Sequence, residues 1–365
     1  MLKILHLIPS LGGGGAERQL AMLAAEQSGR GGSVHVGIRR GGVYEESLDS
    51  SGVVVHLLGD HKGVNPLLLA RINTLIKQIK PDVVHTWLPQ MDIVGGIAAL
   101  WNSVPWIISE RSSELAFECL KLQAWARSYL ARYANAVVAN SSNGAAYWRG
   151  MRPTDVRIFT VANAVDVAVI RNAASVSGNL SNSKNRENDI LVVGRLSPEK
   201  GLEIVIQAVR LVPVKHDIRV LIIGEGPLRE EIEVRIREAG LDDRISLLPF
   251  RPAWWGLLKN ASALISMSRY EGHPNVVLET MAAGCPLIVS DIPAHREFLD
   301  EDSAILVPLD APATLAEAII SILSDPVSAR QRAERASACV AGLTIQSAAD
   351  AYESVYEKVI SGMSQ

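Results

Sequence analysis

The chain has 365 residues, of which 48% are hydrophobic and 5% aromatic, and its formal net charge is −3 at pH 7. This length exceeds that of one ordinary domain, and the scarcity of aromatic residues is typical of parallel sheets filled with aliphatic side chains. The net charge argues neither for nor against nucleic acid, but the first 165 residues carry 16 Lys and Arg against 12 Asp and Glu, which fits an anionic partner or a membrane surface. A nucleic-acid partner is not expected.

In the first half, short aliphatic runs alternate with helical patterns and predict parallel strands. A strand at 3–8 leads into the glycine-rich loop 10–15 and a helix at 16–25. An aromatic and basic helix at 117–133 is expected either at a membrane interface or packed on the sheet. Further strands are expected at 34–38, 53–58, 82–85 and 106–108.

The second half repeats this pattern after a segment at 171–188 that is rich in Ser, Asn, Ala and Gly and is typical of a linker. Strands are predicted at 189–193, 219–223, 245–248, 263–266 and 286–289. The sequence therefore predicts an α/β fold with two doubly wound parallel-sheet domains, 1–170 and 189–342, facing a central cleft. Residues 343–365 are expected to form a helix that packs back on the first domain.

Two carboxylates, Glu271 and Glu279, stand eight positions apart around a predicted strand-to-helix loop. The N-terminus of the following helix is suited to phosphate, so carboxylates beside it are better suited to sugar hydroxyl groups. The alternative is an unrelated loop acid and helix-face acid.

Two cations, Arg195 and Lys200, follow the predicted strand at 189–193 and precede a helix. An arginine fork, a lysine charge and helix N–H groups suit a diphosphate, although Lys200 could instead pair with Glu199 or Glu203 on the surface. Gly224 and Gly226 follow the next strand, where they would either let a ligand approach the backbone or simply form a tight turn.

Several other site types are not supported by the sequence. Cys119, Cys285 and Cys339 form no CxxC pair, which fits a reducing compartment, and the eight histidines show no HxxxH or HExxH spacing. There is no GxSxG elbow, no GxxxxGK[ST] loop and no GxGxxG fingerprint in the first loop. The N-terminal apolar stretch is too short for a signal peptide, so a cytoplasmic protein is expected, soluble or peripheral at the inner membrane.

The combined motifs resemble those of the family 4 glycosyltransferases, the retaining enzymes of the GT-B fold. The resemblance rests on GRLSPEKGL at 194–202, the GEGP turn at 224–227 and EGHPNVVLETMAAGCPLIVSD at 271–291. GGGGAERQL, PDVVHTWLPQ, VPWIISERSS and VANAVD extend it over the first half, the last with Ala164 where the family usually has Gly.

The resemblance implies a role for each candidate residue. Arg195 and Lys200 would hold the donor diphosphate, Glu271 would contact the donor sugar, and Glu279 would accept hydrogen bonds from the ribose. No metal or other cofactor would be required. Further nucleotide-sugar contacts are implied at Gly14, Gly15, Gly194, Gly224, Gly226, Phe250, Gly272, His273, Asn275 and Val276.

One segment departs from the family pattern. Many members carry a His in the loop after the strand at 106–108, where this chain has Ser109-Glu110-Arg111-Ser112. Arg111 is expected either to contact the donor or an acceptor phosphate, or to form a structural pair with Glu110. His85 is a further candidate contact, and the alternative for it is a satisfied core histidine.

The sequence therefore predicts a retaining, metal-independent transferase that moves a hexose or N-acetylhexosamine from a nucleotide sugar, expected to be a UDP-sugar. The expected acceptor is a glycan or a polyprenyl-diphosphate-linked sugar in cell-surface polysaccharide assembly. The alternatives are a UDP-sugar 2-epimerase on the same fold and a non-catalytic sugar-nucleotide-binding subunit.

Overall fold

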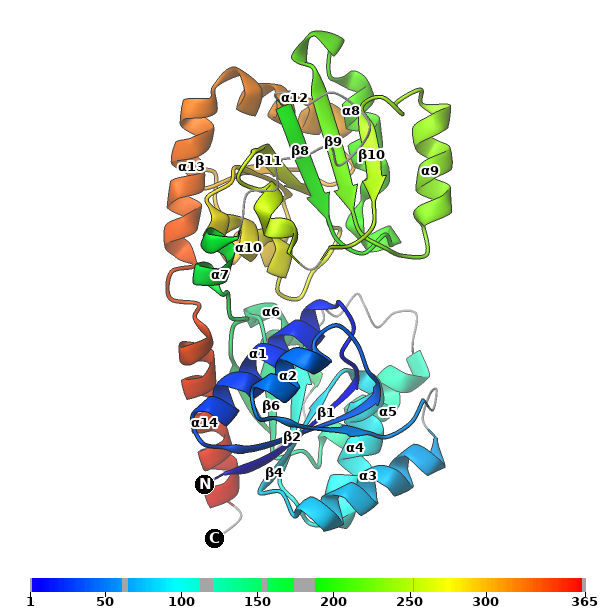
Figure 1. Ribbon diagram of the computed structural model, residues 1–365, viewed down its shortest axis with the longest axis vertical. Coiled ribbons are helices and arrows are strands. Elements are labelled where there is room, and N and C mark those ends of the chain that lie inside the picture. Colours follow the sequence, from blue (N-terminus) through cyan, green and yellow to red (C-terminus); the bar gives the residue numbers. More distant parts are fainter. Residues whose placement is uncertain are drawn as a thin grey trace. The chain divides into compact units, whose positions relative to one another are not determined.

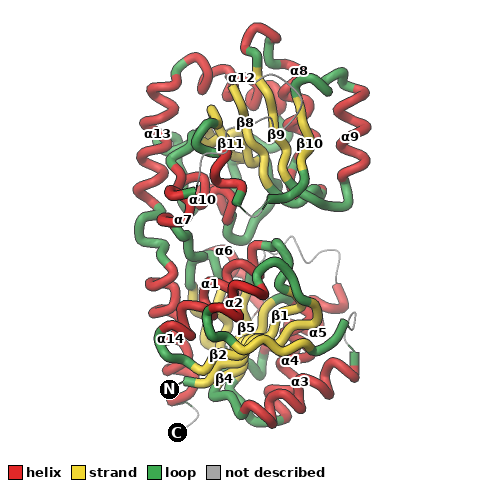
Figure 2. Tube along the Cα trace, viewed as in Figure 1, coloured by secondary structure: helices red, strands yellow, loops and turns green. Residues whose placement is uncertain are grey.

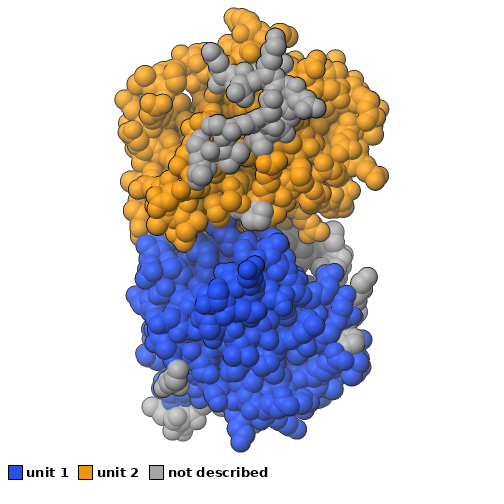
Figure 3. All heavy atoms as spheres, in the orientation of Figure 1, with its two compact units in different colours: residues 1–164, 343–365 blue, residues 165–342 orange. Residues whose placement is uncertain are grey.

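The computed structural model describes residues 2–60, 65–111, 121–151, 156–173, 188–251 and 253–362. The chain forms two compact units, drawn in blue and orange in Figure 3: Met1–Ala164 with Leu343–Gln365, and Val165–Gly342. Residues 174–187 lie outside the described ranges, so the linker predicted at 171–188 stays a prediction.

Unit 1 is built on a seven-stranded parallel sheet with the strand order β3-β2-β1-β4-β5-β6-β7 (Figure 1). Its order reverses between β1 and β4, which pair directly, with His6 opposite His85. The strands are β1 (Lys3–Ser10), β2 (Ser33–Arg40), β3 (Val54–Leu57), β4 (Val83–Trp87), β5 (Trp106–Glu110), β6 (Ala136–Ala139) and β7 (Arg157–Thr160).

Helices cover both faces of this sheet, because the strands are aliphatic on both sides and bury two separate apolar clusters. One cluster includes α1 and the C-terminal helix α14, and the other includes α3, α4 and Trp148 of α6. The helices of unit 1 are α1 (Gly15–Gly29), α2 (Glu45–Ser50), α3 (Pro66–Ile79), α4 (Pro89–Trp101), α5 (Lys121–Ala131), α6 (Ser142–Met151) and α14 (Ile345–Ser361).

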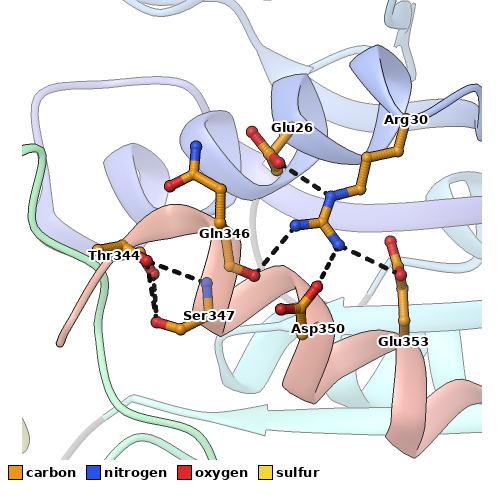
Figure 4. A network of polar contacts seen from close by, with 7 residues as sticks. All are labelled: Glu26, Arg30, Thr344, Gln346, Ser347, Asp350 and Glu353. Carbon is orange, nitrogen blue, oxygen red and sulfur yellow. Dashed lines mark hydrogen bonds and ion pairs between the residues drawn. The ribbon is translucent and has the colours of Figure 1, made fainter.

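The C-terminal helix α14 is held on α1 mainly by its apolar face. Tyr352, Val355, Tyr356 and Val359 are buried on one side of it, and each such side chain stabilises the packed state by about 1.5–3 kcal/mol. At the rim, Arg30, the C-cap residue of α1, donates to Glu26, Asp350, Glu353 and the Gln346 carbonyl (Figure 4). These exposed ion pairs add little individually, so the apolar face carries most of the attachment.

Unit 2 contains a six-stranded parallel sheet with the order β10-β9-β8-β11-β12-β13. Figure 2 shows its strands in yellow beside red helices. The strands are β8 (Asn188–Val193), β9 (Ile218–Ile223), β10 (Ile245–Leu248), β11 (Ala261–Ser266), β12 (Leu287–Ser290) and β13 (Ile305–Val307). The helices are α7 (Val167–Asn172), α8 (Leu202–Leu211), α9 (Arg229–Glu238), α10 (Asn275–Ala283), α11 (Pro293–Arg296), α12 (Pro312–Ser324) and α13 (Pro326–Cys339).

The prediction of two parallel-sheet α/β domains is confirmed. The carboxyl ends of neighbouring parallel strands lie at one edge of a sheet, and ligands bind there where the strand order reverses. In unit 2 that point lies between β8 and β11. In the described part of the chain, no helix combines the length and the apolarity that a bilayer span requires.

Candidate active site

The loops after β8 and β11 bring Lys200 and Glu271 together at the reversal point of unit 2. Lys200 Nζ donates to Glu271 Oε1 over 2.5 Å, and Ser268 Oγ donates to the same oxygen over 2.7 Å. The Lys200 and Glu271 side chains are 25% and 18% exposed, so the pair stays open on one side. Lys200 therefore has a partner other than Glu199 or Glu203, and that partner is itself a predicted site residue.

Glu271 is held in its ionised form. Burial by itself would raise the pKa of this carboxyl group, but the Lys200 charge and the bonds from Lys200 and Ser268 outweigh burial and hold the pKa below its usual range. Both bonds end on Oε1, so within the described ranges Oε2 has no protein partner. An ionised oxygen in this position is suited to accept a bond from a ligand hydroxyl.

Arg195 begins the same loop and is exposed. No described residue forms a hydrogen bond or an ion pair with its guanidinium group. Pro198, Glu199 and Lys200 form a short 3-10 turn, and Gly201 follows in the left-handed region at φ 60°. A side chain at Gly201 would lie 2.3 Å from the Met267 carbonyl oxygen, so glycine is needed where this loop meets the end of β11.

The glycines of the loop after β9 allow the backbones of two loops to pack closely. A Cβ atom at Gly224 would lie 1.8 Å from the Gly194 carbonyl oxygen, and one at Gly226 would lie 2.3 Å from the Leu196 carbonyl oxygen. Leu196 N donates to the Glu225 carbonyl over 2.9 Å, which ties the two loops together. The nucleotide contacts predicted for Gly194, Gly224 and Gly226 stay predictions.

Glu279 lies on α10 and is only 2% exposed. Trp255 Nε1 donates to Glu279 Oε2 over 2.6 Å, a contact that the sequence did not reveal because 24 residues separate the partners. Glu271 thus accepts from an ammonium and a hydroxyl group, whereas Glu279 accepts from an indole.

The remaining predicted donor contacts surround α10 and the end of β10. Gly272 and His273 precede the helix, Asn275 and Val276 begin it, and Phe250 lies half-buried after β10. His273 is buried, and its ring meets Phe298 edge-on with the centroids 4.6 Å apart. The first turn of a helix is a suitable place for phosphate, but the ligand contacts of these residues stay predictions.

In unit 1, Gly14 caps α1 and Gly15 begins it. A Cβ atom at Gly14 would lie 2.2 Å from Glu17 Oε2, so the carboxylate lies close over the glycine backbone. Ser10 Oγ donates to Glu17 Oε1 over 3.4 Å, and burial raises the pKa of Glu17 although its hydrogen bonds oppose this. An acid whose pKa is raised by burial therefore stands at this helix terminus.

His85 lies in the core of unit 1. It is fully buried on β4, its Nδ1 is 2.9 Å from the Tyr356 hydroxyl of α14, and its ring lies 4.8 Å from that of Trp87. Burial, followed by the nearby His6 and Arg111, lowers its pKa well below the ordinary value, so it is neutral. These contacts are those of a core histidine, and its predicted role as a ligand contact is untested.

Arg111 stacks on Trp87, with its Cζ atom 4.8 Å from the ring centroid, and burial lowers its pKa. Glu110 instead pairs with Arg127 Nη1 over 2.5 Å and accepts from Trp148 Nε1 over 2.9 Å. Glu110 also acts on Arg111 through its charge, which raises the pKa of Arg111 against burial, so a structural Glu110–Arg111 pair stays an alternative to a ligand role. Residues 112–120 fall outside the described ranges, and a ligand role for Arg111 stays a prediction.

Two family descriptions match the chain in succession. The Glycosyltransferase Family 4 description matches residues 13–169, and the description Glycosyl transferases group 1 matches residues 179–338.

Two curated relatives illustrate the similarity in sequence. An alpha-D-kanosaminyltransferase of Streptomyces kanamyceticus is 29% identical over 175 residues, which are 47% of this chain and 45% of that enzyme. A UDP-Gal:alpha-D-GlcNAc-diphosphoundecaprenol alpha-1,3-galactosyltransferase of Escherichia coli is 24% identical over 274 residues, 71% of this chain and 70% of that enzyme. The chain thus matches less than half the length of the first relative.

The solved structure of Anabaena HepE in complex with UDP-glucose has a TM-score of 0.85 at 21% identity, covering 98% of this chain and 100% of that one. This likeness shows the fold. Together with the two successive family matches, it shows that the chain belongs to the family 4, group 1 glycosyltransferases of the GT-B fold.

Proposed function

We propose that the chain transfers a hexose or N-acetylhexosamine from a nucleotide sugar to an acceptor hydroxyl, with retention of the anomeric configuration and without a metal ion. The observation that carries this proposal is the Lys200–Glu271 pair at the reversal point of unit 2. A cation suited to a diphosphate and an ionised carboxylate suited to sugar hydroxyls stand side by side there.

In the proposed reaction, the bond from the anomeric carbon to the donor phosphate oxygen breaks, and a bond to the acceptor oxygen forms on the same face. The acceptor proton passes to the departing phosphate, so no protein nucleophile is required. Arg195 and Lys200 stabilise the negative charge that develops on the nucleoside diphosphate. Their fixed charges take the place that a metal ion has in other transferases, and Glu271 orients the sugar while Glu279 holds the ribose.

A UDP-hexose is the first donor to test. The Escherichia coli relative is named for UDP-Gal, and HepE was crystallised with UDP-glucose. A thermal-shift panel of UDP-, GDP- and ADP-sugars identifies the base, and we expect the UDP-sugars to raise the melting temperature most.

Transfer is then measured with the best donor and a lipid-linked sugar acceptor. Lys200→Ala should lower kcat at least tenfold while the protein stays folded, because the leaving-group charge loses its partner. Full activity of a folded Lys200→Ala protein would refute the leaving-group role. A new sugar nucleotide formed from UDP-GlcNAc without acceptor would instead indicate an epimerase.

We further propose that the acceptor is linked to a lipid diphosphate and that α5 brings unit 1 to the membrane surface. Trp125, Tyr129 and Tyr133 are 65%, 44% and 55% exposed, and Arg132 lies over the Tyr129 ring. Residues 119–154 contain five Lys and Arg and no Asp or Glu. Arg127 is buried and paired with Asp92 and Glu110, so the exposed aromatic rings and Arg132 are the groups that suit the interface of an anionic bilayer.

Sedimentation with vesicles tests this contact. The wild-type chain should bind vesicles that contain phosphatidylglycerol more strongly than neutral vesicles, and the double variant Trp125→Ser/Tyr129→Ser should lose most of that binding. The matched control, Leu211→Ser/Val214→Ser, removes exposed apolar side chains from unit 2 and should bind normally. Equal binding by all three proteins would contradict the proposed surface.

A further inference from the structure

A chain of buried polar groups leads from α11 to the carboxylate of Glu271. His295 Nδ1 is 2.7 Å from the Ser290 carbonyl oxygen, and Ser290 Oγ donates to the Ser268 carbonyl over 2.5 Å. Ser268 Oγ then donates to Glu271 Oε1 over 2.7 Å, the oxygen that also accepts from Lys200. The residues come from three successive structural segments: Ser268 follows β11, Ser290 ends β12, and His295 lies on α11.

The members of this hydrogen-bonded series are buried, except for the last one. Ser268, Ser290 and His295 are 2%, 0% and 0% exposed, whereas the Glu271 side chain is 18% exposed. Buried polar groups are costly unless they are bonded, so each link restricts the orientation of the next. The restriction ends at the Glu271 carboxylate, which is partly exposed and can meet a ligand.

The contacts also fix the state of the His295 ring. A carbonyl oxygen only accepts, so Nδ1 must carry the proton, and the ring is neutral because burial lowers its pKa. Its Nε2 is buried and has no hydrogen-bond partner within the described ranges. Among the described residues, the hydrogen bonds of the imidazole go to the carbonyl and the hydroxyl oxygen of Ser290.

The Lys200–Glu271 mechanism does not by itself explain this arrangement. Besides the Lys200 ammonium, Glu271 Oε1 receives a second, neutral donor in Ser268, which also helps to hold the pKa of the carboxyl group down. Two donors on Oε1 fix the rotation of the carboxylate, so Oε2 points away from Lys200 and Ser268. A sugar hydroxyl would then meet an acceptor that is already oriented.

We propose that Ser268, Ser290 and His295 are positioning residues that orient Glu271, and Lys200 through it, toward the sugar of the donor. The inference rests on the proposed function, because it refines how that site recognises the sugar rather than the nucleotide. It gives Ser290 and His295 a part in sugar recognition, although both lie outside the segment from Glu271 to Glu279.

The test separates sugar recognition from nucleotide binding. The affinities for UDP and for the UDP-sugar donor are measured by calorimetry, and kcat and KM for transfer are measured alongside. Ser268→Ala should lower kcat tenfold or more and shrink the affinity gap between UDP-sugar and UDP, while the affinity for UDP changes less than twofold. Ser290→Ala should act in the same direction with a smaller effect.

Variants at His295 provide a rescue experiment. His295→Asn keeps an N–H donor close to the position of Nδ1 and should retain most activity, whereas His295→Leu fills similar volume without a donor and should resemble Ser290→Ala. The matched control is Ser303→Ala, which removes a buried hydroxyl bonded to Asp300 elsewhere in unit 2 and should leave kcat unchanged.

The outcomes distinguish this inference from the proposed function. If the wild type transfers sugar but Ser268→Ala and His295→Leu behave like Ser303→Ala, the positioning role is wrong and the function stands. If the wild type transfers no sugar from any donor, the proposed function fails. The difference between the affinities for UDP-sugar and for UDP, the affinity gap, then still tests the positioning role. A gap unchanged by Ser268→Ala refutes it, and a gap that shrinks supports it. Should the Ser290 variant fail to fold, Ser268→Ala and His295→Asn decide the question.

Discussion

At the scale of single residues, the two carboxylates of the site are held by donors of different charge. Glu271 faces the Lys200 ammonium, whereas Glu279 accepts from the neutral indole of Trp255. We propose a sugar and leaving-group role for the Lys200–Glu271 pair and a ribose role for Glu279, in line with their positions in the loops after β8 and β11 and on α10.

Replacing Glu279 by Ala should weaken UDP binding by roughly ten- to a hundredfold. Hydrogen bonds to a charged group contribute about 1.5–3 kcal/mol, and 1.4 kcal/mol corresponds to a factor of ten. Calorimetry with UDP measures the change, and Trp255→Phe, which leaves the carboxylate in place, should cost less. An unchanged affinity for UDP in Glu279→Ala would remove this residue from the ribose role.

His6 makes the stability of the chain depend on pH. Trp87 Nε1 donates to His6 Nδ1 over 3.2 Å, and His6 Nε2 is 2.9 Å from Gln27 Oε1, so the buried ring is bonded in its neutral form. Burial lowers its pKa from 6.5 to about 4, although the bond to Gln27 opposes the change. The unfolded chain therefore binds the proton more readily between these two values.

Because the folded pKa is depressed, this contribution to stability is complete above pH 6.5 and is lost as the pH falls toward 4. The loss amounts to about 3 kcal/mol. Asp92 acts in the opposite direction, since burial raises its pKa to about 6, so the wild-type curve alone does not isolate His6. Urea unfolding of wild type and His6→Gln between pH 7 and 4 should show a shallower loss in the variant. Parallel curves would contradict this role of His6.

The sequence singled out candidate residues that lie within one motif, whose roles stay predictions, but it did not reveal the partners that hold them. Lys200, Glu271 and Glu279 stand out because glycine, proline and helix signals surround them. Ser268, Trp255 and His295 carry no local signal, since their roles depend on which strands become neighbours. The Glu110–Arg127 pair was missed for the same reason: the sequence offered Arg111 as the adjacent cation, but packing of α5 on the sheet places Arg127 there.

At the scale of elements, α14 combines a buried face with an exposed rim. The hydroxyl of Tyr356 links the helix to the sheet, because it lies 2.9 Å from His85 Nδ1 and accepts from Gln27 Nε2 over 3.4 Å. Arg30 links the same helix to α1 at the surface, where its side chain is 27% exposed.

Tyr356→Phe should therefore destabilise the chain more than Arg30→Ala. Loss of the buried hydroxyl leaves two buried polar groups unsatisfied and costs about 1–3 kcal/mol, whereas an exposed ion pair contributes about 0–1 kcal/mol. Urea unfolding of the two variants measures the difference, and a larger loss in Arg30→Ala would show that the rim, not the buried face, holds α14.

Two strands of unit 1 were not predicted. Ala136–Ala139 and Arg157–Thr160 are only four residues each, and such short runs give a weak period in any sequence. They form as β6 and β7 because β5 already offers an edge with which β6 can pair. The predicted helix at 117–133 is described as α5 from Lys121 to Ala131, with its first residues outside the described ranges.

At the scale of the whole molecule, strand order explains why the site residues meet. Alternation of strands and helices predicted two parallel sheets, but not that β8 would have β9 on one side and β11 on the other. That order places the cation loop after β8 beside the carboxylate loop after β11. In unit 1, β1 and β4 are neighbours in the same way, with Leu7 of β1 opposite Thr86 of β4.

The most direct test of the central claim is the anomeric configuration of the product, measured by NMR after transfer from a UDP-hexose to a lipid-linked sugar in the presence of EDTA. We expect a product with the same anomeric configuration as the donor, formed at an undiminished rate without free metal. A product of inverted configuration, or a reaction that stops with EDTA and resumes with added divalent metal, would contradict it.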